Sequence, residues 1–147
     1  MTPEDKEVQA FVRGIVQSAI RVDLYPKTLI QIVVQELESD RPHLSLALNC
    51  ICAALLDSGI CMRMTFAATA VAVLPSGKVL LHPAAHQLTD SSSLLTVVFD
   101  SCSNHVLAVR QQGRPLPRDR IRLCVEAGLT DCDHIFRTLT SAVKRGE

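Results

Sequence analysis

The segment from Pro42 to Gly59 constrains the fold most, because its apolar residues surround nearly the whole circumference of a helix. Pro42 suits the start of a helix, and Gly59 supplies a left-handed C-terminal stop. Such a helix must be covered on more than one side, which predicts a layered α+β domain. The 147 residues are enough for one domain of ordinary size, and we expect a single domain over residues 1–147.

The rest of the chain predicts two more helices and five strands. A helix starting at Thr2 carries an apolar stripe at three- and four-residue spacing to about Val22. Residues 28–38 are rich in β-branched side chains and apolar on both alternations, which is typical of a central strand buried on both faces. Two hairpins follow, 61–74 with 79–82 and 94–100 with 105–110, and a last helix begins after Pro115 and Pro117. The predicted order is α-β-α-β-β-β-β-α.

Charge and composition exclude several classes of protein. Lys plus Arg and Asp plus Glu both number 15, so no global positive field would hold nucleic acid nonspecifically. Five aromatic residues and no Trp leave few platforms for base stacking. The six cysteines contain no CxxC pair and lie mostly in apolar segments, which favours reduced core thiols over a zinc site. The acidic N-terminus and the short apolar stretches predict a soluble intracellular protein.

Arginine is the most unevenly distributed residue, with 11 Arg against 4 Lys. Five arginines lie within thirteen residues: Arg110, Arg114, Arg118, Arg120 and Arg122. Arg41 and Arg63 are two further candidates. Guanidinium groups bind phosphate and carboxylate in bidentate geometry, so these residues are candidates for contacting RNA or an acidic neighbouring subunit. A solvated loop leading into a helix explains the cluster equally well.

Other chemical motifs are weak or missing. The sequence has no GxSxG elbow, P-loop or GxGxxG. His82 and His86 are four residues apart but lack a third metal ligand nearby. His43 lies at a helix start, where an ordinary helix residue explains it better than an anion ligand does. We therefore expect no metal and no cofactor.

A resemblance to a known family rests on a helix and its exit into a strand. The stretch is Leu48-Asn49-Cys-Ile-Cys-Ala-Ala-Leu-Leu-Asp57-Ser-Gly59-Ile-Cys-Met62-Arg63, with Tyr25-Pro26-Lys27-Thr28 before it and Leu81-His82-Pro83 after it. It resembles the RNase PH-like family, above all noncatalytic members of the eukaryotic exosome ring, and the likeness runs from about Asp5 to Arg145. The resemblance implies an RNase PH-like (ribosomal protein S5 domain 2-like) fold.

The same resemblance implies partners and a role. It implies a hetero-hexameric ring with other RNase PH-like exosome subunits, RNA threaded through that ring, and no membrane. The implied role is 3′-to-5′ RNA processing and degradation, including rRNA maturation and mRNA decay, in the nucleus, nucleolus and cytoplasm.

Active relatives hold phosphate with a Gly-Gly-Thr/Ser-Arg cradle at the start of the second helix. The matching residues are Arg41-Pro42-His43-Leu44, where Pro42 removes an amide donor and Leu44 replaces the phosphate-clamping arginine. The Asp-x-Asp acids of active relatives match approximately Ser92 and Leu94, and Asp90 is the one carboxylate of that loop. The resemblance therefore implies a noncatalytic subunit.

Two other functions stay open. One is an active phosphorolytic or metal-dependent nuclease that uses surviving acids such as Asp90 and Asp100. The other is a free-standing homodimer without a role in RNA metabolism. Family members carry further strands before the helix that begins here at Thr2, so we expect a domain that lacks its N-terminal strands and exposes strand edges. Ring assembly also predicts that some stripe residues, for instance in the last helix, are exposed in the monomer.

Overall fold

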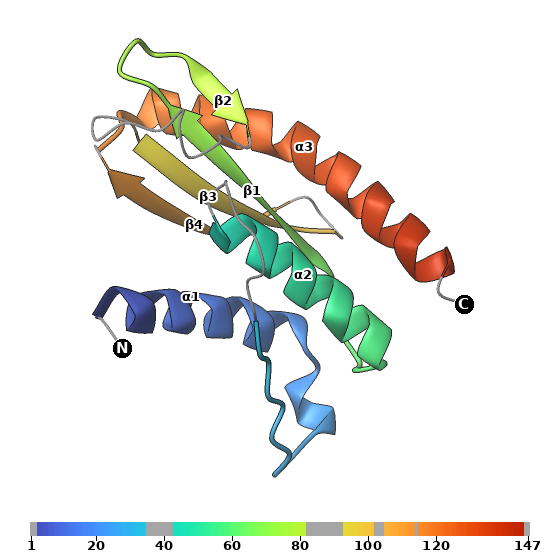
Figure 1. Ribbon diagram of the computed structural model, residues 1–147. Coiled ribbons are helices and arrows are strands. Elements are labelled where there is room, and N and C mark those ends of the chain that lie inside the picture. Colours follow the sequence, from blue (N-terminus) through green and yellow to red (C-terminus); the bar gives the residue numbers. More distant parts are fainter. Residues whose placement is uncertain (1–2, 35–42, 82–92, 102–104, 114, 146–147) are drawn as a thin grey trace.

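The structure is a computed structural model that describes residues 3–34, 43–81, 93–101, 105–113 and 115–145. Its elements are α1 (Pro3–Ala19), a short 3-10 helix η1 (Val22–Leu24), α2 (His43–Ser58), β1 (Phe66–Val73), β2 (Val79–Leu81), β3 (Ser93–Asp100), β4 (Val106–Gly113) and α3 (Arg118–Arg145). The layered α+β arrangement, the three helices and the two hairpins are confirmed (Figure 1).

The four strands form one antiparallel sheet in the order β2-β1-β3-β4. Phe66 and Ala68 of β1 pack in the same core cluster as α1 and α2. Ala67 and Val71, on the opposite face of the same strand, pack with Cys124 and Cys132 of α3. Helices thus cover both faces of β1, and the same holds for most of β3, which explains why these strands are mostly apolar.

The two helices on the first face leave part of α2 open. Leu48, Ile51 and Leu55 are buried against α1 and the sheet. Leu46, on the outer side of α2, is 46% exposed. The predicted enclosure of this helix is therefore incomplete, because α1 and the sheet cover one side of it.

The last helix packs its whole described stripe against the sheet. Every described member of that stripe is buried or half-buried: Ile121, Cys124, Val125, Gly128, Cys132, Ile135, Phe136 and Leu139. The prediction that some stripe residues are exposed in the monomer is therefore wrong for the described stripe of this helix. The reason is that α3 is the cover for the second face of β1 and β3, so its apolar residues are needed within the domain.

The central strand predicted over 28–38 is also wrong for its described part. Residues 28–34 form no strand, and 35–38 lie outside the described residues. Leu29 is 87% and Val33 78% exposed. A β-branched, apolar sequence becomes a strand only when a neighbouring strand pairs with its backbone, and residues 28–34 have no such neighbour in the described parts of the chain.

The first hairpin begins later than predicted. Residues 61–65 precede β1, and Met62 forms an isolated antiparallel bridge with Ile20 just after α1. Arg63 N–H also donates to the Ala19 carbonyl at 2.7 Å. These residues therefore fasten the end of α1 to the domain instead of extending the strand.

Candidate functional site

The structure divides the arginine cluster between the two faces of the sheet. Arg110 lies on β4 opposite Thr96 of β3, on the face that carries α1 and α2. Arg118, Arg120 and Arg122 lie in the first turns of α3, which covers the other face. Arg41 and Arg114 lie outside the described residues. Neighbours in sequence are thus separated in space, and the proposed role of each arginine in binding stays a prediction.

Two candidate arginines, Arg63 and Arg110, have described ion pairs, and the side chain of Arg110 is the less exposed of the two. Its side chain is 11% exposed, and a terminal nitrogen lies 3.9 Å from Glu7 Oε1, which is 72% exposed. Its Nε is buried and has no hydrogen-bond partner among the described residues. A buried donor without a partner costs on the order of 1–3 kcal/mol, and more when it belongs to a charged group. The Glu7 contact is long and solvated, so Arg110 retains capacity for an anion.

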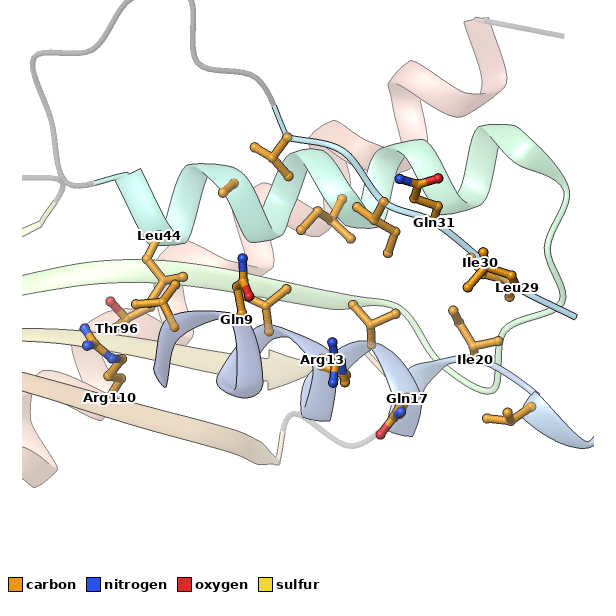
Figure 2. A pocket seen from close by; sticks show the side chains of 18 of the residues that line it. Gln9, Arg13, Gln17, Ile20, Leu29, Ile30, Gln31, Leu44, Thr96 and Arg110 are labelled. Carbon is orange, nitrogen blue, oxygen red and sulfur yellow. The ribbon is translucent and has the colours of Figure 1, made fainter. Parts of the chain in front are cut away.

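Arg110 lies at one end of a large groove of ≈ 1240 Å³. Figure 2 shows Gln9, Arg13 and Gln17 along α1, with the segment of Leu29, Ile30 and Gln31 across from them. Most of the lining is aliphatic and comes from α1, residues 22–34, α2, β3 and β4. Among the described residues of its lining, the charged members are Arg13 and Arg110, and none is Asp or Glu. The groove, defined by these residues, is apolar with positive charge.

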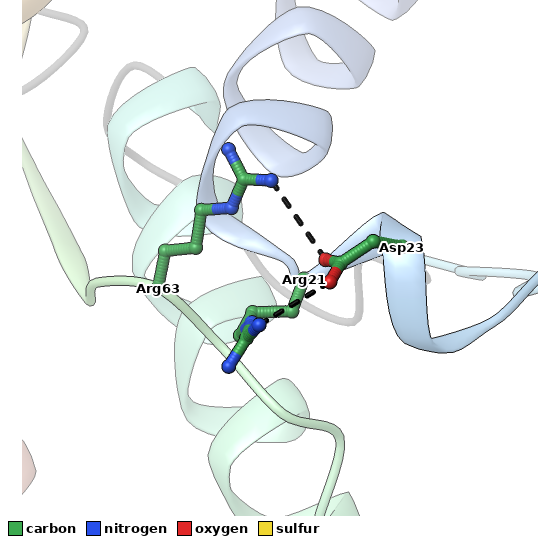
Figure 3. A network of polar contacts seen from close by, with 3 residues as sticks. All are labelled: Arg21, Asp23 and Arg63. Atoms are coloured by element: carbon green, nitrogen blue, oxygen red, sulfur yellow. Dashed lines mark hydrogen bonds and ion pairs between the residues drawn. The ribbon is translucent and has the colours of Figure 1, made fainter.

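Arg63 belongs to a small surface network with Arg21 and Asp23 (Figure 3). Asp23 carboxylate oxygens lie 3.2 Å from a terminal nitrogen of Arg21 and 3.8 Å from one of Arg63. All three side chains are at least half exposed, so the pairs stabilise the fold little. Two guanidinium groups share one carboxylate, which leaves one net positive charge at this corner.

The three arginines at the start of α3 are exposed. Arg120 Nη1 donates to the Gly77 carbonyl at 3.4 Å, which links α3 to the turn between β1 and β2. Positive charges near the N-terminus of a helix oppose its dipole by roughly 0.3–1 kcal/mol each. Asp119 is the acid in that first turn. The helix dipole therefore does not favour these arginines, and their role in binding stays a prediction.

Of the residues that match the phosphate cradle of active relatives, Arg41 and Pro42 lie outside the described residues, as do Asp90, Ser92, His82 and His86. His43 begins α2. Leu44 is half-buried against the core cluster and lines the groove. Leu94, at the other matching position, also lines the groove. Both described positions hold aliphatic side chains in apolar surroundings.

Three of the described cysteines, Cys52, Cys124 and Cys132, are buried thiols that resist ionisation. Burial raises the pKa of Cys52 and of Cys124, and burial with the charges of Asp131 and Asp133 raises the pKa of Cys132 to about 12. Cys50 and Cys61 are exposed and free. Over the described part of the chain, no group of three or more His, Cys, Asp or Glu side chains is arranged to hold a metal ion.

Two buried polar contacts escaped the sequence interpretation. Asn49 Nδ2 donates to the Ala68 carbonyl at 2.9 Å, and Ala68 N–H donates to Asn49 Oδ1 at 2.8 Å. Thr69 Oγ1 donates to Asp131 Oδ2 at 2.8 Å. Asn49 is a polar residue in the apolar middle of α2, and this contrast in the sequence indicates a buried hydrogen bond. These contacts hold α2 and α3 against β1, so their role is structural.

Comparison with known proteins points to ribonuclease-related proteins. The model of the 3′ exoribonuclease family, domain 1, matches residues 1–61. The Arabidopsis thaliana protein "Exosome complex exonuclease RRP46 homolog" is 26% identical over 103 residues, which are 70% of this chain and 43% of that protein. This chain therefore spans less than half the length of that relative.

Solved structures agree on the fold. The crystal structure of rice (Oryza sativa) Rrp46 superposes with a TM-score of 0.87 at 22% identity, covering 98% of this chain and 68% of that chain. The Archaeoglobus fulgidus exosome with RNA bound to the active site gives a TM-score of 0.69 at 15% identity, covering 93% and 62%. The chain therefore has the RNase PH-like fold that the resemblance implied. No helix in the described ranges combines the length and hydropathy needed to cross a membrane.

Proposed function

We propose that this chain is a noncatalytic subunit of the RNA exosome core, of the type of exosome component five. It would take its place in a hetero-hexameric ring with other RNase PH-like subunits and support 3′-to-5′ RNA processing and degradation as RNA is threaded through the ring. rRNA maturation and mRNA decay in the nucleus, nucleolus and cytoplasm are part of this proposal.

The observation that carries the proposal is the superposition on rice Rrp46 over 98% of this chain. The match of residues 1–61 to the 3′ exoribonuclease family and the Arabidopsis RRP46 homologue support the same direction. The noncatalytic part of the proposal is supported by Pro42 and Leu44 in the stretch where active relatives carry Gly-Gly-Thr/Ser-Arg. An aliphatic side chain offers no charge to the attacking phosphate.

The exposed arginines at the start of α3 are the proposed contacts to RNA. Arg118 and Arg122 project from the start of α3, and both are exposed. The chain has no excess positive charge overall, so no general electrostatic field attracts nucleic acid to it. Its guanidinium groups would instead contact individual phosphates.

Two experiments test the proposal. Affinity purification of the chain from its own cells, followed by quantitative mass spectrometry, is expected to recover RNase PH-like exosome subunits in equal amounts. Absence of those subunits would contradict ring membership. Incubation of the purified chain with single-stranded RNA and phosphate, and then with Mg²⁺, is expected to release no nucleotide. Release of nucleoside diphosphates would instead establish the phosphorolytic nuclease, and release of monophosphates with Mg²⁺ the metal-dependent one.

A further inference from the structure

We propose that Arg120 is a positioning residue for the RNA-binding surface at the start of α3 and does not bind RNA itself. Its guanidinium group packs on the turn between β1 and β2 and thereby holds the first turn of α3 in place. That turn presents Arg118 and Arg122 to RNA. The inference rests on the proposed RNA contact of Arg118 and Arg122, and it assigns a separate role to the third arginine of the same segment.

The start of α3 has little stability of its own. The first four N–H groups of any helix lack partners within that helix, and helix ends are the first parts of a native protein to open. Residues 118–122 include three arginines, whose charge opposes the helix dipole, and Asp119 is the acid of the first turn. Contacts with the rest of the domain therefore decide whether this turn stays folded.

Arg120 connects this helix start to the turn between β1 and β2. Its Nη1 donates to the Gly77 carbonyl at 3.4 Å. A Cβ atom built on Gly77 would lie 3.3 Å from Arg120 Nη2 and 3.7 Å from its Cζ, so the guanidinium lies directly on the backbone of the turn. The turn itself is closed by a hydrogen bond from Gly77 N–H to the Leu74 carbonyl at 2.8 Å. Gly77 has a φ of +90°, so glycine suits both the turn and the close approach of Arg120.

Arg118 and Arg122 lie on another side of α3. They are four residues apart and share one side of the helix, whereas Arg120 is two residues from each and points elsewhere. Both are exposed, and in the described part of the chain neither forms an ion pair. Their positions are about 6 Å apart along the helix axis, so both guanidinium groups can bind phosphates of one strand. The helix geometry thus separates the two RNA contacts from the contact that supports them.

The test displaces Arg120 and keeps every charge. Gly77→Ala places a methyl group against the guanidinium, which must move away from the turn. Oligouridylate that carries 4-thiouridine is crosslinked to the purified chain, and crosslinks to residues 118–122 are quantified by mass spectrometry. We expect Gly77→Ala to lower these crosslinks about threefold and to speed amide hydrogen exchange in the first two turns of α3 at least about fivefold. If Arg120 bound RNA itself, its release from the turn would leave crosslinking unchanged or raise it.

Gly59→Ala is the matched control for this substitution. Gly59 also has a positive φ, +79°, but a Cβ atom there meets nothing within 4 Å. Both substitutions strain a left-handed residue, so both should lower the urea midpoint by a similar amount. Crosslinking and hydrogen exchange at the start of α3 are expected to change in Gly77→Ala alone. In a chain that already carries Arg120→Gln, Gly77→Ala should add little to either readout, because the guanidinium that it displaces is gone.

The outcomes separate this proposal from the RNA contact on which it rests. If Arg118→Glu combined with Arg122→Glu lowers crosslinking but a folded Gly77→Ala does not, the positioning role alone is overturned. If that double variant leaves crosslinking unchanged, the RNA contact fails and the positioning role fails with it. Equal losses in Gly59→Ala would assign the effect to strain in general and overturn the proposal. If Gly77→Ala does not fold by circular dichroism, Arg120→Gln decides, and unchanged hydrogen exchange at the start of α3 in that variant overturns the proposal.

Discussion

Gly128 is the residue at which α3 comes closest to the sheet. A Cβ atom built at this position would lie 2.8 Å from Thr69 Cγ2 and 3.5 Å from Phe99 Cε2. Thr69 cannot yield easily, because its hydroxyl donates to Asp131. Replacing a helical glycine by alanine normally gains up to about 1 kcal/mol, whereas overpacking a core costs about 1–3 kcal/mol. We expect Gly128→Ala to lower the free energy of unfolding by about 1–2 kcal/mol in urea titrations.

Gly14 of α1 provides the matched control for that substitution. A Cβ atom at Gly14 meets no atom within 4 Å, and the residue is exposed. Gly14→Ala is therefore expected to raise the free energy of unfolding by about 0.5–1 kcal/mol through helix propensity alone. Equal effects of the two substitutions would show that α3 does not approach β1 as closely as described.

The cysteines should differ sharply in their reaction with iodoacetamide. Thiolate is the reactive form, and with a pKa of about 12 roughly one Cys132 side chain in ten thousand is ionised at pH 8. Cys52 and Cys124 are also buried with raised pKa values, while Cys50 and Cys61 are exposed. Peptide mapping after labelling at pH 8 should find Cys50 and Cys61 modified first, and the three buried thiols only in urea. Rapid labelling of Cys132 in the folded chain would contradict the packing of α3.

The raised pKa of Cys132 also predicts how stability depends on pH. The thiol ionises near its ordinary value of 9.0 in the unfolded chain but near 12 in the folded one. Above pH 9 the unfolded chain loses this proton first, so the free energy of unfolding falls as pH rises from 9 toward 12, by up to about 1.4 kcal/mol per pH unit. Urea titrations at pH 8 and pH 10 should show this fall, and it should be smaller in Cys132→Ala. An unchanged fall in Cys132→Ala would assign it to other groups.

At the scale of elements, the side chain of Asn49 holds α2 against β1 through hydrogen bonds. Its amide makes two hydrogen bonds to the backbone of Ala68, which is fully buried. Asn49→Ala would leave the Ala68 N–H and C=O unpaired in the core, and we expect a loss of about 2–3 kcal/mol in the free energy of unfolding. Thr138→Ala removes an exposed hydroxyl that bonds within its own helix, and it should stay within about 0.5 kcal/mol of the unaltered chain. Similar losses of stability in both variants would rule out this role of the Asn49 hydrogen bonds.

The elements that the sequence predicts correctly are those with a clear local pattern. The two hairpins follow from apolar runs joined by turn residues, and the stripe of α3 follows from three- and four-residue spacing. Residues 28–34 carry an equally strong strand pattern, but pairing depends on a distant neighbour that a local pattern cannot supply. The same limit applies to the arginines, since strand β4 and helix α3 turn Arg110 and Arg118 to opposite faces of the sheet.

At the scale of the whole molecule, the apolar side chains with the largest exposed fractions lie between α1 and α2, although Leu123 of α3 is also 49% exposed. Leu29, Val33 and Val34 are 87%, 78% and 55% exposed, and all precede α2. The described stripe of α3 is covered. The apolar side chains that stay most open to water therefore lie before α2, while the start of α3 carries exposed arginines.

The exposed arginines of α3 should then affect RNA without affecting the fold. Arg118→Glu combined with Arg122→Glu reverses two charges and leaves Arg120 on the Gly77 carbonyl. We expect crosslinking of single-stranded RNA to the assembled complex to fall at least about threefold, while the free energy of unfolding of the isolated chain changes by less than about 0.5 kcal/mol per substitution. Arg137→Glu, which reverses an exposed charge farther along α3, controls for net charge. If Arg137→Glu lowers crosslinking as much per substitution as the double variant does, the effect belongs to overall charge and not to a contact at the start of α3.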